Sequence, residues 1–577
     1  MEITGKISTT LATLLDLQSP LVLSTCASYY DKFYLPIRDW FVGSLCVSVS
    51  SATDLMRDMK VTVLMSALCM LRGCTAYDIL VFLPNPIWSH YVQVEHIIHS
   101  LGLRGHNVTV LSPYPTKNGT ENVRHFFLAP ETSPAYLFGN LMERYTDAPH
   151  PIFRLGERKR RADQQVPQLL RSALFRDLIS NDNKFDLIFT ELFFGFEAFV
   201  ALGNIFNAPV VTYSSYGYDG DIFRYSGAAN AISYLSMKHL PYGGPMSLMQ
   251  RLENTLLHIA TVLYTEYWFL PHHDALLAEY IPGPLPRITD MLGNVSLFFL
   301  TANTALDGAK VYPPNVIEIS GIHLKEPGPL DEDLKTIMDT AKNGVIFFCF
   351  GSILKASDFR REAIHAFLSV FEELDQTILW KADLNASEGN IPKNIHIKDW
   401  FPQTSVLAHP NCVLFLTHGG VSSMMEAIKH AVPVVGIPFY GDQIVNLANA
   451  EYFGYGLRVT YKNLSQQSLR WAMTTVLGDS RFKENIRKAS KIFTDKPMSS
   501  LETALYWIEY VARHKGAHHL KPLAAKMPWC QLLLLDVIVV YSGAFIVILC
   551  FALKFVSCLV KKSVFKSGNF KKKIKSN

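Results

Sequence analysis

Short hydrophobic runs alternate along the chain with segments in which hydrophobic residues recur at helical spacing. Residues 79–83 form an apolar run that stops at a proline, residues 89–101 have helical spacing, and residues 107–111 form a second apolar run. Short apolar runs joined by amphipathic segments are typical of parallel strands connected by helices. This stretch therefore predicts a βαβ unit.

The same alternation continues through most of the chain. Further strands are predicted at residues 185–190, 209–212, 295–300 and 316–319, and then at residues 345–350, 377–380, 395–397, 413–416 and 433–437. Between the two groups, residues 325–334 read KEPGPLDEDL, a linker composition. The pattern predicts an α/β fold in two halves with mainly parallel sheets. Their expected bounds are 77–324 and 335–526, with a helical excursion over an apolar cleft at residues 221–285.

The end of the chain predicts a membrane anchor. Residues 532–560 are almost wholly apolar, and the tail at residues 561–577 contains seven lysines and no acid. An apolar helix of this kind can span a bilayer, and the positive-inside rule places the basic tail in the cytosol. Lys573 and Lys575 resemble the dilysine signal of endoplasmic reticulum proteins. We therefore expect a single-pass type I protein of that membrane, with its body in the lumen.

A lumenal body requires a signal peptide, which residues 59–76 supply. Lys60 precedes an apolar run at residues 61–71, and small residues at 74–76 suit cleavage. Because this segment does not start the chain, we interpret residues 1–58 as an upstream extension or a gene-model artefact. A second membrane segment at residues 40–52 is the alternative. Glycosylation sequons occur at Asn107, Asn118, Asn294, Asn385 and Asn463, of which Asn107 is expected in a buried strand.

Composition excludes several classes of protein. Of the 577 residues, 49% are hydrophobic and 18% charged, which does not suit a disordered chain. The net charge is only +4 and no basic stripe with interleaved aromatics occurs, so nucleic-acid binding is not expected. The nine cysteines include no CxxC, and the two in the body, Cys349 and Cys412, are expected to be buried thiols.

Residues 414–430, LFLTHGGVSSMMEAIKH, place His418, Gly419 and Gly420 between a predicted strand and a helix at 421–431. In sheets of this kind, ligands bind at the carboxyl ends of strands. The first N–H groups of a helix have no internal partner and carry the positive end of its dipole. The turn therefore predicts a phosphate site with His418 as an added donor. A tight turn packed in the core is the alternative.

Other polar residues suit the same ligand. Ser422 and Ser423 can cap the turn, and Glu426 lies where a carboxylate could accept a sugar hydroxyl. Before this strand come Trp400 and Gln403, which could stack on a base and read a ribose; after the next strand come Asp442 and Gln443, which could read hydroxyls. Together these groups predict a ligand that contains a base, phosphates and a polyol.

The stretch WFPQTSVLAHPNCVLFLTHGGVSSMMEAIKHAVPVVGIPFYGDQIVNLANAE, residues 400–451, resembles the signature of the UDP-glycosyltransferases of family 1. The resemblance extends from about Tyr77 to the tail, and it looks closest to animal members, with arthropod ones as a candidate group. It implies a GT-B fold, in which two Rossmann-like domains face a cleft. The nucleotide sugar is then held by the C-terminal half and the acceptor by the N-terminal half.

The resemblance also implies roles for individual residues in binding the UDP-sugar. Trp400 would stack on uracil, and Gln403 and Glu426 would hold the ribose. The diphosphate would be held by Ser352, His418, Gly419, Gly420, Ser422 and Ser423, and the sugar hydroxyls by Asp442 and Gln443. Many relatives have asparagine where this chain has Ser422, so that side-chain contact departs from the family pattern.

The catalytic pair implied by the resemblance is His90 with Glu191. His90 would take the proton of the acceptor hydroxyl, and Glu191, where relatives often have aspartate, would orient and stabilise the imidazole. The implied reaction is a single displacement with inversion and without a metal cofactor. Two Asp-x-Asp strings, at residues 219–221 and 331–333, are interpreted as solvated loops.

We therefore predict a transferase that moves a hexosyl group from a UDP-sugar to a hydroxyl of a small lipophilic acceptor. UDP-glucose is the favoured donor and UDP-glucuronate the next. Aromatic stretches at residues 193–199 and 213–218 suggest the lipophilic acceptor. A membrane-anchored binding protein without catalysis is the main alternative; a nicotinamide oxidoreductase is disfavoured because no GxGxxG occurs. The sequence leaves open whether the protein has partner subunits in the membrane.

Overall fold

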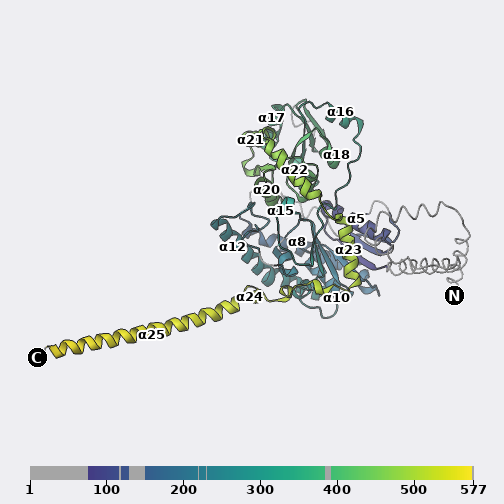
Figure 1. Cartoon of the computed structure of the whole chain (residues 1–577). Helices are drawn as coiled ribbons and strands as arrows, with labels where there is room; N and C mark the ends of the chain where they lie inside the picture. The colour runs from purple at the N-terminus through teal and green to yellow at the C-terminus, as the bar shows by residue number, and fades with distance from the viewer. Residues whose placement is uncertain are drawn as a thin grey trace, which may run out of the picture. The chain divides into compact units, whose positions relative to one another are not determined.

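Two parallel β-sheets organise the chain in the computed structural model (Figure 1). The structure describes residues 76–115, 119–128, 150–218, 220–228, 231–383 and 391–574. Several expectations concern residues outside these ranges. These are the upstream segment 1–58 and residues 59–75 of the predicted signal peptide. They also include Asn118, Asp219, Asn385 and the last three residues, among them Lys575.

The first sheet has seven strands in the order β3-β2-β1-β4-β5-β6-β7, and all neighbours are parallel. The strands are β1 Asp78–Phe82, β2 Asn107–Ser112, β3 Val123–Phe127, β4 Leu187–Thr190, β5 Val210–Ser214, β6 Leu297–Leu300 and β7 Val316–Glu318. The central strands are buried along nearly their whole length, as expected for a parallel sheet covered on both faces.

The second sheet has six parallel strands in the order β10-β9-β8-β11-β12-β13. They are β8 Val345–Cys349, β9 Thr377–Lys381, β10 Ile395–Lys398, β11 Cys412–Thr417, β12 Val434–Gly436 and β13 Gly456–Arg458. The two sheets and the structural neighbours described below confirm the predicted pair of Rossmann-like halves.

Helices connect the strands within each half. Those of the first are α5 Trp88–Leu103, α8 Leu155–Arg171, α9 Ala173–Ser180, α10 Ala201–Ile205, α11 Gly220–Ser226, α12 Leu248–Tyr264, α13 Leu270–Tyr280, α14 Ile288–Leu292 and α15 Thr304–Asp307. Those of the second are α16 Glu332–Thr340, α17 Arg361–Glu372, α18 Gln403–Ala408, α19 Val421–Lys429, α20 Gln443–Tyr452, α21 Gln466–Gly478 and α22 Ser480–Thr494. The irregular stretch at 221–285 is thus largely helical.

Several local features differ from the predicted pattern. Asp221, which was expected in a solvated loop, is 2% exposed in the first turn of α11. Strands β3 and β13 were not expected; β3 is a half-exposed edge strand of sequence VRHFF and β13 has only the three residues GLR, so neither has a clear apolar run. Asn107 is exposed rather than buried, because it is the first residue of β2. The extended linker ends at Asp331, whose carboxylate caps α16 by accepting from the Leu334 N–H at 2.7 Å.

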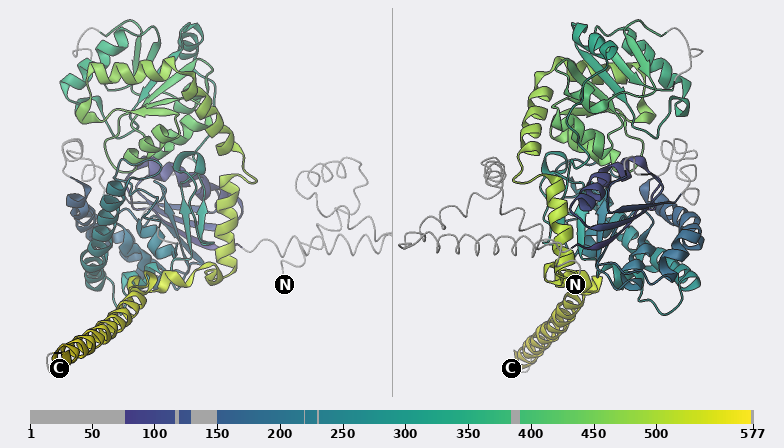
Figure 2. Two further views of the ribbon diagram at one scale, coloured as in Figure 1. Left: turned by 60° about the vertical axis from the view of Figure 1, so that its left-hand side comes forward. Right: turned by 90° about the vertical axis from the view of Figure 1, so that its right-hand side faces the viewer.

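Helix α23, Ser500–Arg513, packs on the first sheet although it follows the second in the chain (Figure 2). Leu505 and Ile508 share one buried cluster with Ile79 of β1 and Ile97 of α5. Arg104, just after α5, pairs with Glu502 and, at 2.8 Å, with Glu509 of α23. Residues 335–526, expected as one C-terminal domain, are therefore divided between the two halves.

The chain ends in a long apolar helix. Short helix α24, Trp529–Leu532, precedes α25, Leu535–Ile574, within which Leu535–Val564 is long and apolar enough to cross a membrane. Every residue of Leu535–Val564 is exposed, so this part of the helix is not buried against the rest of the described structure. The segment matches the predicted anchor at residues 532–560 in place and character.

Candidate active site

Each sheet has one switch point, where the order of its strands reverses, and the two switch points face one cleft. In the first sheet β1 lies between β2 and β4, and in the second β8 lies between β9 and β11. Ligand crevices form outside the carboxyl ends of strands at such switch points. His90 follows β1, Glu191 follows β4, Ser352 follows β8 and His418 follows β11. The cleft has a volume of about 800 Å³ and is lined by residues of both halves.

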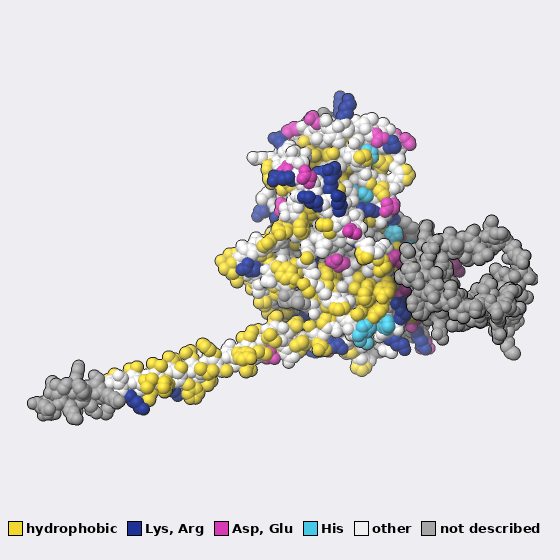
Figure 3. Space-filling view, viewed as in Figure 1, with side chains coloured by type: hydrophobic (Ala, Val, Ile, Leu, Met, Phe, Trp, Pro, Cys, Tyr) yellow, Lys and Arg dark blue, Asp and Glu magenta, His cyan; other side chains and the backbone are white. Residues whose placement is uncertain are grey.

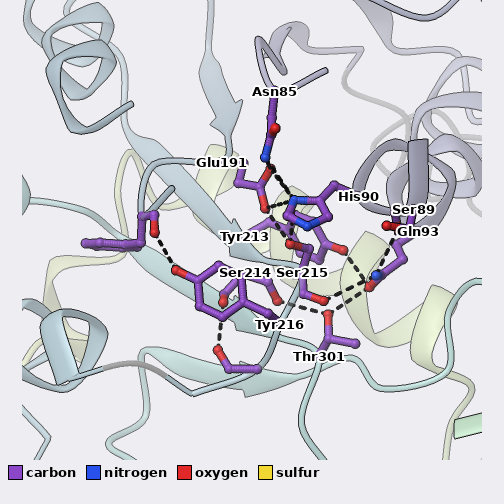
Figure 4. Close-up of polar contacts among 12 residues, drawn as sticks. Asn85, Ser89, His90, Gln93, Glu191, Tyr213, Ser214, Ser215, Tyr216 and Thr301 are labelled. Carbon is purple, nitrogen blue, oxygen red and sulfur yellow. Dashed lines mark hydrogen bonds and ion pairs between the residues drawn. The ribbon is translucent and has the colours of Figure 1, made fainter. Parts of the chain in front are cut away.

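His90 and Glu191 form a hydrogen-bonded pair (Figure 4). His90 Nδ1 lies 2.9 Å and 3.1 Å from the two carboxylate oxygens, and Glu191 is only 2% exposed. Because an ionised carboxylate can only accept, Nδ1 carries the proton in this pair. The other ring nitrogen, Nε2, is then the one that can take a proton. His90 itself lines the cleft, whereas Glu191 lies behind it.

Asn85 and Ser215 complete the support of this pair and were not predicted. Asn85 Nδ2 donates to Glu191 Oε2 at 3.0 Å, and Ser215 Oγ donates to Oε1 at 2.6 Å (Figure 4). Burial opposes ionisation of Glu191, but the His90 charge and these hydrogen bonds outweigh it and hold the pKa below its ordinary value. Ser215 directly follows β5, so the strand-end rule could have pointed to it.

Glu426 lies in a preformed polar pocket in the second half. Its carboxylate accepts hydrogen bonds from the Gln403 side-chain amide and, at 2.7 Å, from Thr404 Oγ1. Ser423 Oγ also accepts from the Gln403 amide, at 3.3 Å. Burial raises the pKa of Glu426 despite these donors. Gln403 and Glu426, which the sequence predicts to share one part of the ligand, are thus in direct contact.

Trp400 presents an open ring at the same end of the cleft. Its side chain is 64% exposed, and the Lys381 ammonium lies 5.0 Å from the ring centre. Lys381 Nζ also donates to the Gly351 carbonyl at 2.5 Å, in the turn that carries Ser352. Lys381 was not predicted, although its place at the end of β9 is a strand-end position. It adds a positive charge to a region expected to hold a nucleotide.

The glycines after β11 are required by close packing. Gly419 has φ +87°, and a Cβ there would lie 2.5 Å from Leu447 Cγ. A Cβ on Gly420 would lie 2.6 Å from His418 Nε2. His418 Nδ1 is buried and has no hydrogen-bond partner among the residues that the structure describes. Burial and the Lys381 charge lower the pKa of His418 to about 4, so the ring is neutral near pH 7.

We expect Gly420→Ala to weaken UDP binding about tenfold or more, because the added methyl group must displace the His418 ring. Isothermal titration with UDP would measure this. Gly478→Ala is the matched control, since a Cβ at Gly478 meets nothing within 4 Å. Equal affinity in the Gly420 variant and the parent would contradict a ligand role for this turn.

Asp442 and Gln443 are partly used in holding the site together. Asp442 Oδ2 accepts from the Val421 N–H at 3.1 Å, so the first N–H of α19 is already paired, and from Asn446 Nδ2 at 2.8 Å. Gln443 Oε1 accepts from the N–H groups of Phe439 and Tyr440. Both side chains line the cleft, and the Gln443 amide NH₂ remains the part that can donate to a ligand.

Ser422 connects the two halves of the molecule. Its Oγ accepts from Gln93 Nε2 of α5 at 3.0 Å, and its carbonyl accepts from His323 Nε2 at 3.3 Å. Gln93 Oε1 in turn accepts from Tyr213 at 2.5 Å and from Thr301 at 2.9 Å (Figure 4). The departure from the family pattern at Ser422 thus coincides with a hydrogen bond across the cleft.

We expect Gln93→Leu to lower the free energy of unfolding by about 2 kcal/mol, because it leaves the buried Tyr213 hydroxyl without its acceptor, whereas Thr301 keeps the Ser214 carbonyl. Ser422→Ala removes only the bond across the cleft and should cost about 1 kcal/mol or less. Thermal unfolding of both variants in detergent would compare them. A larger loss in Ser422→Ala would contradict this account of the network.

Comparison with known proteins gives the same assignment as the site. The family described as "UDP-glucoronosyl and UDP-glucosyl transferase" matches residues 151–570. A UDP-glycosyltransferase, UGT4, from Dactylopius coccus is 32% identical over 88% of this chain and all of its own. UDP-glucuronosyltransferase 2B7 from Homo sapiens is 28% identical over 78% of this chain and 87% of its own.

Solved structures support the fold. The glycotransferase of kitacinnamycin has a TM-score of 0.52 at 17% identity, and CalG4, the calicheamicin glycosyltransferase, has 0.50 at 18% identity. Each is covered completely and covers 76% of this chain, which confirms the GT-B fold. The signature at residues 400–451, the two switch points and these relatives agree, and the chain belongs to the UDP-glycosyltransferase family, as an enzyme that transfers glucosyl or glucuronosyl groups.

Proposed function

We propose that this enzyme transfers a hexosyl group from a UDP-sugar to a hydroxyl of a small lipophilic acceptor, with inversion at the anomeric carbon. The observation that carries the proposal is the His90–Glu191 pair, with the histidine on the cleft wall and the carboxylate buried behind it. A histidine held in this way can accept the proton of an attacking hydroxyl. The facing wall of the same cleft contains His418 and the Gly420 turn.

The proposed chemistry is one displacement. The acceptor oxygen gives its proton to His90 Nε2 and attacks the anomeric carbon, while the bond to the diphosphate breaks and UDP leaves. Glu191 stabilises the imidazolium as it forms. The start of α19, the neutral His418 ring and the Lys381 ammonium lie where they can stabilise the negative charge that grows on the diphosphate. No step in this scheme requires a metal.

The remaining site residues are proposed to hold the donor. Trp400 would stack on the uracil, while Gln403 and Glu426 would bind the ribose hydroxyls. Asp442 and Gln443 would contact the sugar. The other residues proposed to contact the diphosphate are Ser352, Gly419, Ser422 and Ser423. UDP-glucose is the favoured sugar donor and UDP-glucuronate the next, since the similar proteins include UDP-glucosyltransferase 2 of Dactylopius coccus at 32% identity.

A lipophilic acceptor suits the walls of the first half of the cleft. Phe193, Phe194, Tyr216 and Tyr218 line it, and the Phe194 ring lies 5.1 Å from the His90 ring, in edge contact. Aromatic side chains bind flat apolar molecules through dispersion and offset stacking. A phenol or another hydroxyl-bearing lipophile would fit these rings. We further propose a type I location in the endoplasmic reticulum membrane, with α25 as the anchor.

The test is UDP release from membranes that contain the protein, with UDP-glucose or UDP-glucuronate and a pool of lipophilic phenols. Acceptor-dependent release with one donor would support the transferase and identify that donor. The anomeric coupling in the product spectrum would report inversion. UDP binding without release under any of these conditions would instead support an inactive UDP-sugar-binding protein. Loss of both binding and release would contradict the proposed nucleotide site.

A further inference from the structure

Helix α12 carries a continuous apolar face that is open to solvent. Leu252, Leu256, Ile259 and Leu263 follow one another at spacings of three and four residues and are between 40% and 58% exposed. Residues at this spacing lie on one side of a helix. The one carboxylate in α12, that of Glu253, is not part of this row of residues, and it is paired with His150 at 2.7 Å.

The apolar face continues beyond α12 at both ends. Leu248 and Met249 extend it at the start, and Tyr267 and Trp268 extend it in the π-helical turn η3, Thr265–Phe269; all four are more than half exposed. Phe153, 75% exposed, lies in the short helix η1, Pro151–Arg154, which contacts α12. Figure 3 shows hydrophobic side chains gathered where Figure 1 labels α12. Contiguous apolar surface of this kind marks an interaction site.

The opposite side of α12 faces the cleft. Leu257, Thr261 and Tyr264 line the cavity that also contains His90. One helix therefore separates the cleft from the exposed apolar face. This position makes the face part of the wall of the acceptor half rather than a remote patch.

Helix α12 also lies near the point where the chain leaves for α25. Helix α11 joins the two: a methyl group on Gly220, at its start, would lie 3.6 Å from His258 of α12. One on Gly227, just after its end, would lie 2.7 Å from the Ala525 nitrogen. These glycines are about 10 Å apart along a helix. The segment that leads into α25 is thus close to α12.

We propose that the apolar face of α12 and η3 lies against the lipid surface beside the α25 anchor. Helices with leucines and aromatics on one side bind in the plane of the membrane interface, where tryptophan and tyrosine are also enriched. The short distance to the anchor segment brings this face within reach of the bilayer. The proposal rests on the proposed membrane location, but not on the proposed reaction.

The test places a photo-crosslinking residue, p-benzoylphenylalanine, at one position at a time in the full chain, in phosphatidylcholine vesicles. Leu256 is the test position on α12. Ile546 in α25 is the membrane control, and Ile492 in α22 is the solvent control. The three side chains are matched, with exposed fractions of 58%, 58% and 57%. Mass spectrometry would identify the adduct of each.

We expect phospholipid adducts at positions 256 and 546 and none at position 492. An adduct at 546 alone would overturn the proposal for α12 and leave the anchor in place. No adduct at 546 would overturn the membrane location, and the proposal with it. A crosslink from position 256 to a second chain would show that another copy covers this face, which also overturns the proposal. Equal labelling at 492 would show that the labelling is unspecific and would count against it.

Discussion

His90→Ala should lower kcat about 10²- to 10⁴-fold while leaving the affinity for UDP nearly unchanged. The variant removes the only ring nitrogen that is proposed to take the acceptor proton, and it does so in the half opposite the predicted nucleotide pocket. The loss is expected in the chemical step because the hydroxyl must then give its proton to water. Steady-state UDP release and calorimetric UDP binding would separate the two effects.

The matched control for this prediction is His99→Ala. His99 lies in the same helix, α5, but contacts Thr120 and does not line the cleft. We expect it to keep the parent rate. If His90→Ala kept a kcat within about tenfold of the parent, His90 would not be the base. A large loss of UDP affinity in the same variant would instead indicate that the two halves no longer close on the donor.

Glu191→Gln should lower kcat about 10²- to 10³-fold. Glutamine keeps an oxygen that can accept from His90 Nδ1 but removes the negative charge that stabilises the imidazolium; neutralising the corresponding carboxylate of a serine-protease triad costs about 10⁴-fold. Glu191→Asp keeps the charge on a shorter side chain and should stay within about tenfold of the parent, since relatives often have aspartate here. A Gln variant as active as the Asp variant would contradict a role for the charge.

The parent and Glu191→Gln should also differ in how their stability depends on pH. The pKa of Glu191 is lower in the folded protein than its ordinary value of 4.5, so the ionised carboxylate stabilises the fold above that pH. This contribution is lost as the pH falls through the lowered pKa. We therefore expect the difference in melting temperature between parent and Glu191→Gln to shrink below about pH 4.5. A difference independent of pH would mean that packing, rather than charge, is lost.

Much of this architecture could be predicted because the strands are apolar runs of a buried parallel sheet. The turn at His418–Gly420 could be placed at a strand end for the same reason, and the structure puts it at a switch point. The order of strands could not be predicted from the pattern. That order places β4 beside β1 and β5 beside β4, so that Ser215 and Asn85 meet Glu191, a contact with no local signal at Asn85.

Contacts between the two halves could not be predicted from the sequence either. In the sequence, Gln93 is one polar residue of a helix with no special signal. Only the structure shows that its side-chain amide donates to Ser422 of the other half. Lys381 is the last residue of β9. Its contact with the Trp400 ring depends on which strands lie beside β9, and the sequence pattern does not give that order. The apolar face of α12 fitted the expected helical cover of the cleft, but the period alone does not say which side of a helix is outside.

The return of α23 to the first sheet has a consequence for biosynthesis. The face formed by β1 and α5 is completed by Leu505 and Ile508, which the ribosome adds only after the whole second half. At about 5–20 residues per second, roughly 10 to 40 s separate synthesis of β7 from that of α23. During this interval an apolar surface of the first half stays uncovered. The nascent chain is then a substrate for chaperones, and a stop codon before residue 500 would leave the earlier half incomplete as well as the later one.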